Sequence, residues 1–421
     1  MQILEGMLTL LVGNFNSVGD NDHMGLLTGL KVLEIGEHVS APYAAANFVR
    51  LGAEVVKIEP PRGDVSRKHG PYPNNIPDME QSALFLAHNH GKKSVLLDLN
   101  TSAGQSHLKA MIPHFDLVVE NQKLGFFDDR SLGFSKINRI NPSLIWISIL
   151  PFGEIGPYSN YLADDLILFH MSGNAHGMIG PVEDPNLEPP IRAGGYQSHM
   201  VAGLTASTAA MIANYRRLNT GEGCRIVVSE LNSMITMAIS GIANTAFGHP
   251  PPTRQLSKVE GSSIGGMVSA IGGVLKCNDG YVAISPREDA QWERWLDILG
   301  HPDWSKEEKF LSREGRQNNV SELWDLLTEW SSRKSKFDIA KWGQEKRIPC
   351  FPVNTIQDLL VDKHLEAREF FVEINHTQGG SLLHPGLPYK LSNADLPKGM
   401  ISAPTLGEHT EEIFERYVRN E

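Results

Sequence analysis

Two short stretches carry the side chains best suited to chemistry. The first, PPIRAGGYQSHMVAGLTASTAAMIANYRRL, places His199 between a Gly- and Pro-rich approach and a run with helical periodicity. The second is the pair Asp164 and Asp165, directly before the apolar run LILFHMSG. An imidazole or a carboxylate at such positions can serve as a general base or a nucleophile. A structural role explains each equally well, because Asp165 can cap the first-turn amides of a helix and His199 can bind a loop carbonyl.

The elements that must position these residues follow from alternating strand-like and helix-like patterns. Five apolar runs, many of them rich in β-branched residues, read LKVLEIG, EVVKIEPP, SVLLDLN, DLVVEN and SLIWISI, and a helical segment spans residues 102–112. This alternation predicts a doubly wound α/β domain with a parallel sheet and a ligand site at the C-terminal ends of its strands. The turn after the first run, GEHVSAP, has one glycine, whereas dinucleotide-binding folds need G-x-G-x-x-G. The sequence therefore argues against a dehydrogenase.

Composition excludes several other classes of function. With 421 residues and 41% hydrophobic content, the chain can form two or three domains with substantial cores. A net charge of -11 without any basic run argues against nucleic-acid binding. No apolar run reaches the roughly 18 to 20 residues of a membrane span. The cysteines are far apart, which indicates neither disulfides nor a metal site and favours a cytoplasmic location: Cys224, Cys277 and Cys350.

Ordered sequence blocks extend along almost the whole chain. They include GLKVLEIG, LGAEVVKIEPPRGD, NHGKKSVLLDLN, INPSLIWISI, FGEIGPY, DLILFHMSG, TGEGCRIVVSELNSM and APTLGEHTEEIFE. In order and spacing this set resembles the family III CoA-transferases, the group that contains formyl-CoA transferase and carnitine CoA-transferase. The resemblance covers about residues 29–418.

The resemblance implies a domain organisation. It predicts a doubly wound large domain and a smaller α+β domain joined by long linkers, in a monomer that forms an open ring through which its partner passes. The implied parts are an N-terminal extension (1–28), the large domain (29–247), a linker (248–273), the small domain (274–346), and a linker that returns to the large domain (347–421).

The resemblance also implies a chemistry and places the nucleophilic aspartate four residues before Gly203, where this chain has His199. In such transferases a carboxylate attacks the thioester to give a mixed anhydride, and CoA then attacks the aspartyl carbonyl. An imidazole forms an acylimidazole instead and has no carbonyl for an enzyme-bound thioester. His199 is therefore not a substitute for the aspartate. Asp165 is the nearest candidate carboxylate in the matching upstream block.

Coenzyme A or acyl-CoA is the implied substrate, and no metal is implied. By resemblance, the CoA contacts are His38, Val39, Ser40, Ala41, Leu97, Asn121, Gln122 and Arg130. The chain departs from the family pattern at Gln122 and Leu124, which replace an aromatic residue and a proline, and at Leu162 and Asn100, which replace basic residues of some members. Solvated surface positions are an alternative explanation for several cations: Arg62, Arg67, Lys92, Lys93 and Arg130.

Of three functional hypotheses, the sequence favours the first, because the nucleophile is absent and several CoA-contact positions depart from the family pattern. In the first, the chain resembles a subunit of a heteromeric family III transferase that uses a succinyl-CoA type donor, and a paralogous partner carries the aspartate. In the second, Asp165 or His199 is the base of an acyl-CoA racemase, lyase or hydrolase. The racemase branch of this fold carries HDINY and a second histidine, whereas this chain has ADDLIL and Asn138. In the third, the chain is a scaffold without chemistry.

Overall fold

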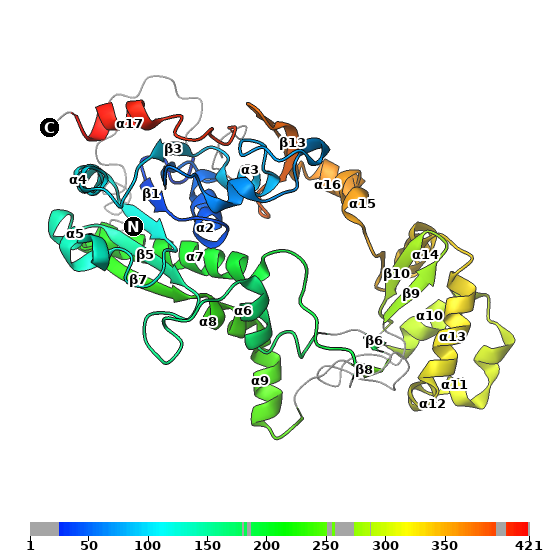
Figure 1. Ribbon diagram of the computed structural model, residues 1–421. Helices are drawn as coiled ribbons and strands as arrows, with labels where there is room; N and C mark the ends of the chain where they lie inside the picture. Colours follow the sequence, from blue (N-terminus) through cyan, green and yellow to red (C-terminus); the bar gives the residue numbers. More distant parts are fainter. Residues whose placement is uncertain are drawn as a thin grey trace, which may run out of the picture. The chain divides into compact units, whose positions relative to one another are not determined.

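The computed structural model describes residues 25–178, 181–182, 187–250, 255–256, 273–286, 288–392 and 401–419. The chain divides into two compact units, drawn in Figure 1. Unit 1 combines residues 1–165, 196–233 and 369–421, and unit 2 combines residues 166–195 and 234–368. Residues 166–195 and 234–247, which the sequence interpretation placed in the large domain, thus group with unit 2. Most of the predicted N-terminal extension and of the predicted linker 248–273 lies outside the described residues.

Unit 1 is built on a six-stranded parallel sheet with the order β3-β2-β1-β4-β5-β7. Its strands are β1 (Lys31–Ile35), β2 (Glu54–Glu59), β3 (Lys93–Leu96), β4 (Leu117–Glu120), β5 (Ile145–Leu150) and β7 (Cys224–Ser229). The five strands predicted from apolar runs are confirmed, and β7 is an addition at one edge. Because the strand order reverses between β1 and β4, the loops that follow these two strands meet at a topological switch point.

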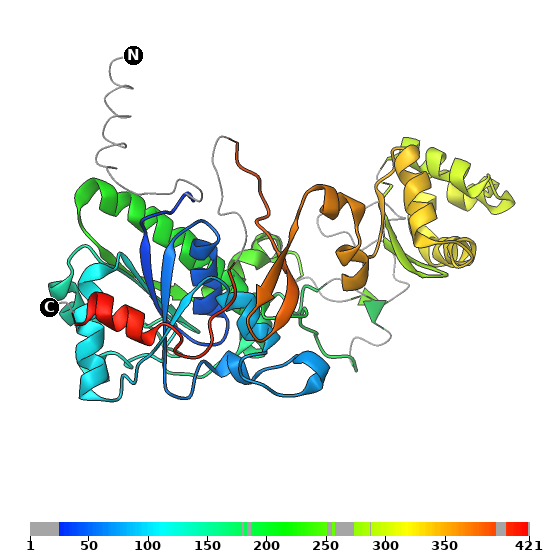
Figure 2. The ribbon, with the colours of Figure 1, turned by 90° about the horizontal axis from the view of Figure 1, so that it is seen from above.

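Helices cover both faces of this sheet. On one face lie α2 (Ser40–Val49) and α7 (Gln197–Thr220), and on the other lie α4 (Ser102–Met111), α5 (Phe134–Ile140) and α17 (Thr410–Tyr417). Figure 2 shows α17 (red) beside α4 (cyan). Strand residues alternate between the two cores: Val32 packs with α2 and α7, and Leu33 packs with the opposite layer. The predicted α/β class is therefore confirmed for this unit.

The close contact between α2 and α7 at Gly203 gives a stability prediction. A Cβ at Gly203 would lie 2.7 Å from the backbone oxygen of Ser40 and 3.0 Å from Cδ1 of Tyr43. Gly203→Ala is expected to lower the free energy of unfolding by about 1–3 kcal/mol, because overpacking outweighs the gain in helix propensity. Urea unfolding followed by circular dichroism measures this loss.

The matched control is Gly194→Ala, because a Cβ at Gly194 meets no atom within 4 Å. Its free energy of unfolding should change by less than about 0.5 kcal/mol. Equal losses in the two variants would show that the helix contact is not the cause.

The C-terminal segment returns to unit 1 and covers the edge strand β3. The backbone N–H of His409 donates to the oxygen of Ser94 (2.9 Å), and the N–H of Leu96 donates to Oγ1 of Thr410 (3.0 Å). The N–H of Gly407 also binds Oγ of Ser94 (2.9 Å). These bonds satisfy backbone groups that an open sheet edge would leave unpaired.

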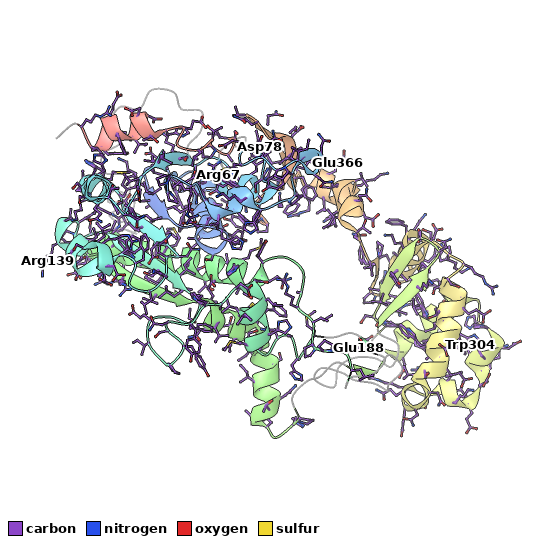
Figure 3. The ribbon with its side chains drawn as sticks, in the orientation of Figure 1. Arg67, Asp78, Arg139, Glu188, Trp304 and Glu366 are labelled. Atoms are coloured by element: carbon purple, nitrogen blue, oxygen red, sulfur yellow. The ribbon has the colours of Figure 1, made fainter. Side chains whose placement is uncertain are left out.

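A buried ion network lies inside unit 1. Nζ of Lys57 is 2.6 Å from Glu34 and 2.7 Å from Asp64, and Nζ of Lys92 is 2.6 Å from Glu34. All of these side chains are fully buried, as is Arg67, which pairs with Glu59 at 2.7 Å and is labelled in Figure 3. The surface explanation of Arg67 and Lys92 is therefore wrong. Burial of these cations is possible because each has carboxylate partners at hydrogen-bonding distance.

Unit 2 contains an antiparallel sheet of β9 (Gly273–Cys277), β10 (Gly280–Ile284) and β11 (Cys350–Pro352). This sheet packs against α10 (Asp289–Leu299), α13 (Val320–Ser331) and α14 (Lys336–Glu345) around Trp292 and Trp295. The other α-helices and strands that the structure describes are α3 (Ala83–Asn89), α6 (Asp165–Met171), α8 (Glu230–Ile235), α9 (Ile239–Ala246), α11 (Glu308–Leu311), α12 (Arg313–Asn318), α15 (Ile356–Leu360), α16 (Lys363–Ala367), the pair β6 (Pro181–Val182) and β8 (Gln255–Leu256), and the hairpin of β12 (Phe371–His376) and β13 (Gly380–Pro385).

Among the described helices, none combines the length and the apolar character that crossing a membrane requires.

Candidate active site

The loop after β1 is fixed by the residue that follows β4. Oδ1 of Asn121 accepts the N–H of Glu37 (2.9 Å), and its Nδ2 donates to the oxygen of Glu37 (2.8 Å) and to Oγ of Ser40 (3.0 Å). Gly36 leaves room for this contact, because a Cβ there would lie 2.3 Å from Cβ of Ala41 in α2 and 3.1 Å from Oδ1 of Asn121 after β4. Hydrogen bonds therefore join the two loops of the switch point at the C-terminal edge of the sheet.

His38 stands at the turn of this loop, connected to the buried ion network. Its backbone adopts a left-handed conformation with φ 67°, which is uncommon for a residue other than glycine. Its N–H donates to Oδ1 of Asp64 (3.0 Å), which is itself paired with Lys57. Burial would raise the pKa of Asp64, but the Lys57 ammonium and the backbone donors hold it at about 2. The loop is thus anchored by a carboxylate that stays ionised.

Three helices begin close to this loop, and each presents an acid or an imidazole in its first turn. Oδ1 of Asp165, the first residue of α6, accepts the N–H of Ser198 in the first turn of α7 (2.7 Å). Nδ1 of His199 lies 3.1 Å from both carboxylate oxygens of Glu230, the first residue of α8. The side chains of Asp165, His199 and Glu230 are all buried. Helix N-termini favour negative charge, so these starts suit carboxylates.

Aromatic rings connect the two parts of the site. The ring centroid of His38 is 5.6 Å from that of His199, 4.9 Å from that of Tyr196 and 5.3 Å from that of His69. Burial lowers the pKa of His38, as do the nearby His199 and His69 rings. Burial also opposes the charged form of His199, but its hydrogen bond to Glu230 and the charges of the nearby carboxylates outweigh burial and raise its pKa. The surroundings therefore shift the two rings in opposite directions, His199 toward the charged form and His38 toward the neutral form.

The structure brings most of the predicted CoA-contact residues together, in two groups. Six lie at the switch point: His38, Val39, Ser40, Ala41, Asn121 and Gln122. The second group lies near the end of β3. Leu97 follows this strand and packs in the core, and the Arg130 side chain donates to Oδ1 of Asn100 (2.6 Å). The side chains of Val39, Ala41 and Leu97 are buried, so contacts of these residues with a nucleotide are left to their backbone atoms. Their binding role stays a prediction.

Sequence reasoning missed Glu230, Asp64 and Tyr196. The sequence signal for Glu230 was its place directly after the apolar run CRIVVS, where a strand ends and a helix begins. Asp64 follows the Pro pair and Gly63, and nothing in that turn predicts its bond to the N–H of His38. Within the part of the chain that the structure describes, no group of three or more His, Cys, Asp and Glu side chains is placed to hold a metal ion.

Comparison with known proteins decides the family. The model of CoA-transferase family III matches residues 27–410. The chain belongs to CoA-transferase family III. Enzymes of this family act on acyl-CoA donors and carboxylic acids, and coenzyme A thioesters are their substrates.

The relatives of this family III chain are similar over nearly their full length. Formyl-CoA:oxalate CoA-transferase of Streptomyces avermitilis is 28% identical over 92% of this chain and 94% of the relative. Succinyl-CoA:glutarate CoA-transferase of Mus musculus is 30% identical over 95% of this chain and 88% of the relative. Succinyl-CoA:(R)-benzylsuccinate CoA-transferase subunit BbsE of Thauera aromatica is 29% identical over 89% of this chain and 90% of the relative.

Among solved structures, a CAIB/BAIF family protein from Brucella suis aligns with this family III chain with a TM-score of 0.83 and 28% identity. The alignment covers 94% of this chain and 100% of that structure.

Proposed function

We propose that this chain transfers CoA between an acyl-CoA and a carboxylic acid and that its own Asp165 accepts the acyl group. The observation that carries the proposal is the bond between Oδ1 of Asp165 and the N–H of Ser198, one residue before His199. The hypothesis of a nucleophile on a partner chain was based on the histidine at position 199 and on the departures from the family pattern at the CoA-contact positions. Asp165 supplies a buried carboxylate next to that position from another helix. This geometry supports a site that needs no second chain to provide its nucleophile.

The proposed reaction uses a carboxylate at each stage. The Asp165 carboxylate attacks the thioester carbonyl, CoA leaves as a thiolate, and an aspartyl–acyl anhydride forms. The thiolate then attacks the Asp165 carbonyl, which releases the first acid and leaves an aspartyl–CoA thioester. The incoming acid attacks that thioester, and the released CoA thiolate attacks the acyl carbonyl of the new anhydride, which frees Asp165. We place the nucleotide part of CoA on the switch-point loops, where ligands of such folds bind.

A second candidate is a non-catalytic subunit whose paralogous partner carries the nucleophile. It is favoured by the 29% identity to subunit BbsE, which is named as a subunit of a succinyl-CoA:(R)-benzylsuccinate transferase. Both candidates include the interlocked dimer that the family resemblance implies, with either a second copy or a paralogue as partner. We also propose a cytoplasmic location, supported by three cysteines that are free thiols.

The experiment that tests the proposal uses the chain expressed alone. We expect the purified protein to transfer CoA from succinyl-CoA to glutarate or from formyl-CoA to oxalate, the pairs named for its relatives. Light scattering of the same sample should give a homodimer. If the chain transfers CoA only after a second chain is added, the non-catalytic candidate replaces ours. Deuterium uptake at the α-carbon of the acyl-CoA without transfer would favour a racemase or lyase instead.

A further inference from the structure

The proton positions on the His199 ring follow from its bond to Glu230. Both carboxylate oxygens of Glu230 lie 3.1 Å from Nδ1 of His199. Because an ionised carboxylate can only accept hydrogen bonds, Nδ1 must carry a hydrogen. Gain or loss of a proton by the ring therefore takes place at Nε2, the nitrogen that does not face Glu230.

Charged groups approach His199 from each element around it. Glu230 faces it from α8, and the carboxylates of Asp165 and Asp164 approach from the start of α6. His38 contacts it from the loop after β1 and prefers the neutral form, since burial lowers its pKa. Burial disfavours a charged His199, yet the carboxylates outweigh burial and raise its pKa. Relative to a free histidine, the surroundings of this ring therefore stabilise the imidazolium, the form that carries a hydrogen on both nitrogens.

We propose that Glu230 keeps His199 protonated and that the N–H at Nε2 of His199 stabilises negative charge on the groups that react at Asp165. This inference rests on the proposed function and assigns a role to two residues outside the nucleophile itself. Glu230 is a positioning residue in this scheme, because it acts through His199.

The chemistry of transfer explains why a fixed cation helps. Negative charge leaves Asp165 when the anhydride forms and appears on the CoA thiolate, and it then moves to the released acid. An N–H that is held in place by Glu230 can bind each anion without reorienting. A general base at this position is not needed, because carboxylates and thiolates attack as anions and no proton has to be removed from them. Loss of one preorganised donor of this kind typically lowers kcat by about 10²–10³-fold.

The experiment compares the pH dependence of kcat/KM in the wild type, three variants and a control, with succinyl-CoA and glutarate as substrates. The wild-type rate should fall as pH rises through the raised pKa of His199, because the deprotonated ring loses its Nε2 hydrogen. Glu230→Gln should move this fall to lower pH, since the charge that favours protonation is gone. Glu230→Asp keeps the charge and should restore the wild-type profile. His199→Gln should lower kcat about 10²-fold and abolish the fall.

Glu222→Gln is the matched control, because it removes an exposed carboxylate that pairs with Arg216 at the surface of the same unit. Its pH profile should equal that of the wild type. A Glu230→Gln enzyme that is active with an unshifted profile would overturn the inference. A merely structural role for Glu230 would change stability and kcat, but not the pH at which activity falls.

A direct titration separates failure of this inference from failure of the proposed function. If the wild type transfers CoA neither from succinyl-CoA to glutarate nor from formyl-CoA to oxalate, the proposed function fails. The contact between His199 and Glu230 is then tested by itself, by NMR titration of the full chain with labelled histidine. The pKa of His199 should fall in Glu230→Gln and stay unchanged in Glu222→Gln. An unchanged His199 pKa in Glu230→Gln would show that the carboxylate does not hold the proton.

Discussion

Asp165→Asn is expected to lower the rate of CoA transfer by about 10³-fold or more, because an amide can neither attack a thioester nor form an anhydride. The fold should survive, since the amide oxygen of asparagine can still accept the N–H of Ser198 that binds Oδ1 of Asp165. Steady-state rates with succinyl-CoA and glutarate measure the loss. Mass spectrometry of the intact wild type after incubation with acyl-CoA should show a covalent CoA adduct that is absent from the variant.

The control for this prediction is Asp338→Asn. Asp338 also lies in the first turn of a helix, α14, but it is exposed and belongs to unit 2. Its rate should match that of the wild type. Full activity of Asp165→Asn would place the nucleophile on another residue or another chain.

Lys57→Met is expected to lower the free energy of unfolding by about 3–5 kcal/mol, because it leaves the buried carboxylate of Asp64 without its cation. Nζ of Lys57 lies 2.6 Å from Oε1 of Glu34 and 2.7 Å from Oδ2 of Asp64, with all three side chains fully buried. Glu34 retains Lys92, whereas Asp64 loses the ammonium that holds its pKa at about 2. Urea unfolding at about pH 7 measures the loss.

The pH dependence of this loss has a definite sign. In the wild type the depressed pKa of Asp64 contributes stability that is present above its unfolded value of 3.8 and is lost as pH falls toward about 2. In Lys57→Met the carboxyl of Asp64 takes up its proton at higher pH. The difference between the two proteins should therefore shrink as the medium is acidified. Lys93→Met is the control: this lysine pairs with Glu412 at the surface, so its removal should cost less than about 1 kcal/mol.

The sequence predicted the fold through local patterns and missed what depends on partners distant in sequence. The runs LKVLEIG and SLIWISI predict strands because apolar residues, several of them β-branched, predominate in both. The segment CRIVVS holds the same signal, and it forms β7. Lys57 and Glu34 lie inside such runs, and only the paired strands show that they neutralise each other. A surface position was an open alternative for Arg67, because a charge in a turn does not reveal the buried carboxylate with which it pairs.

The candidate site shows the same division. Residue type and helix starts singled out Asp165 and His199 as candidates. These residues are more than thirty positions apart in the sequence. No local pattern therefore predicts the hydrogen bond from the N–H of Ser198 to Asp165. Glu230 was not recognised, because a first-turn glutamate is common and only its contact with Nδ1 of His199 gives it meaning.

The pairing of residues 407–410 with β3 has a consequence for folding during synthesis. Ser94 and Gly407 are 313 positions apart, and contacts of such long range form late, since the chain between them loses its freedom first. A ribosome completes β3 long before it adds residues 407–410. During that interval the nascent sheet has an open edge that a second chain can pair with. We therefore expect the yield of folded protein to depend on how soon the last residues emerge and pair with this edge.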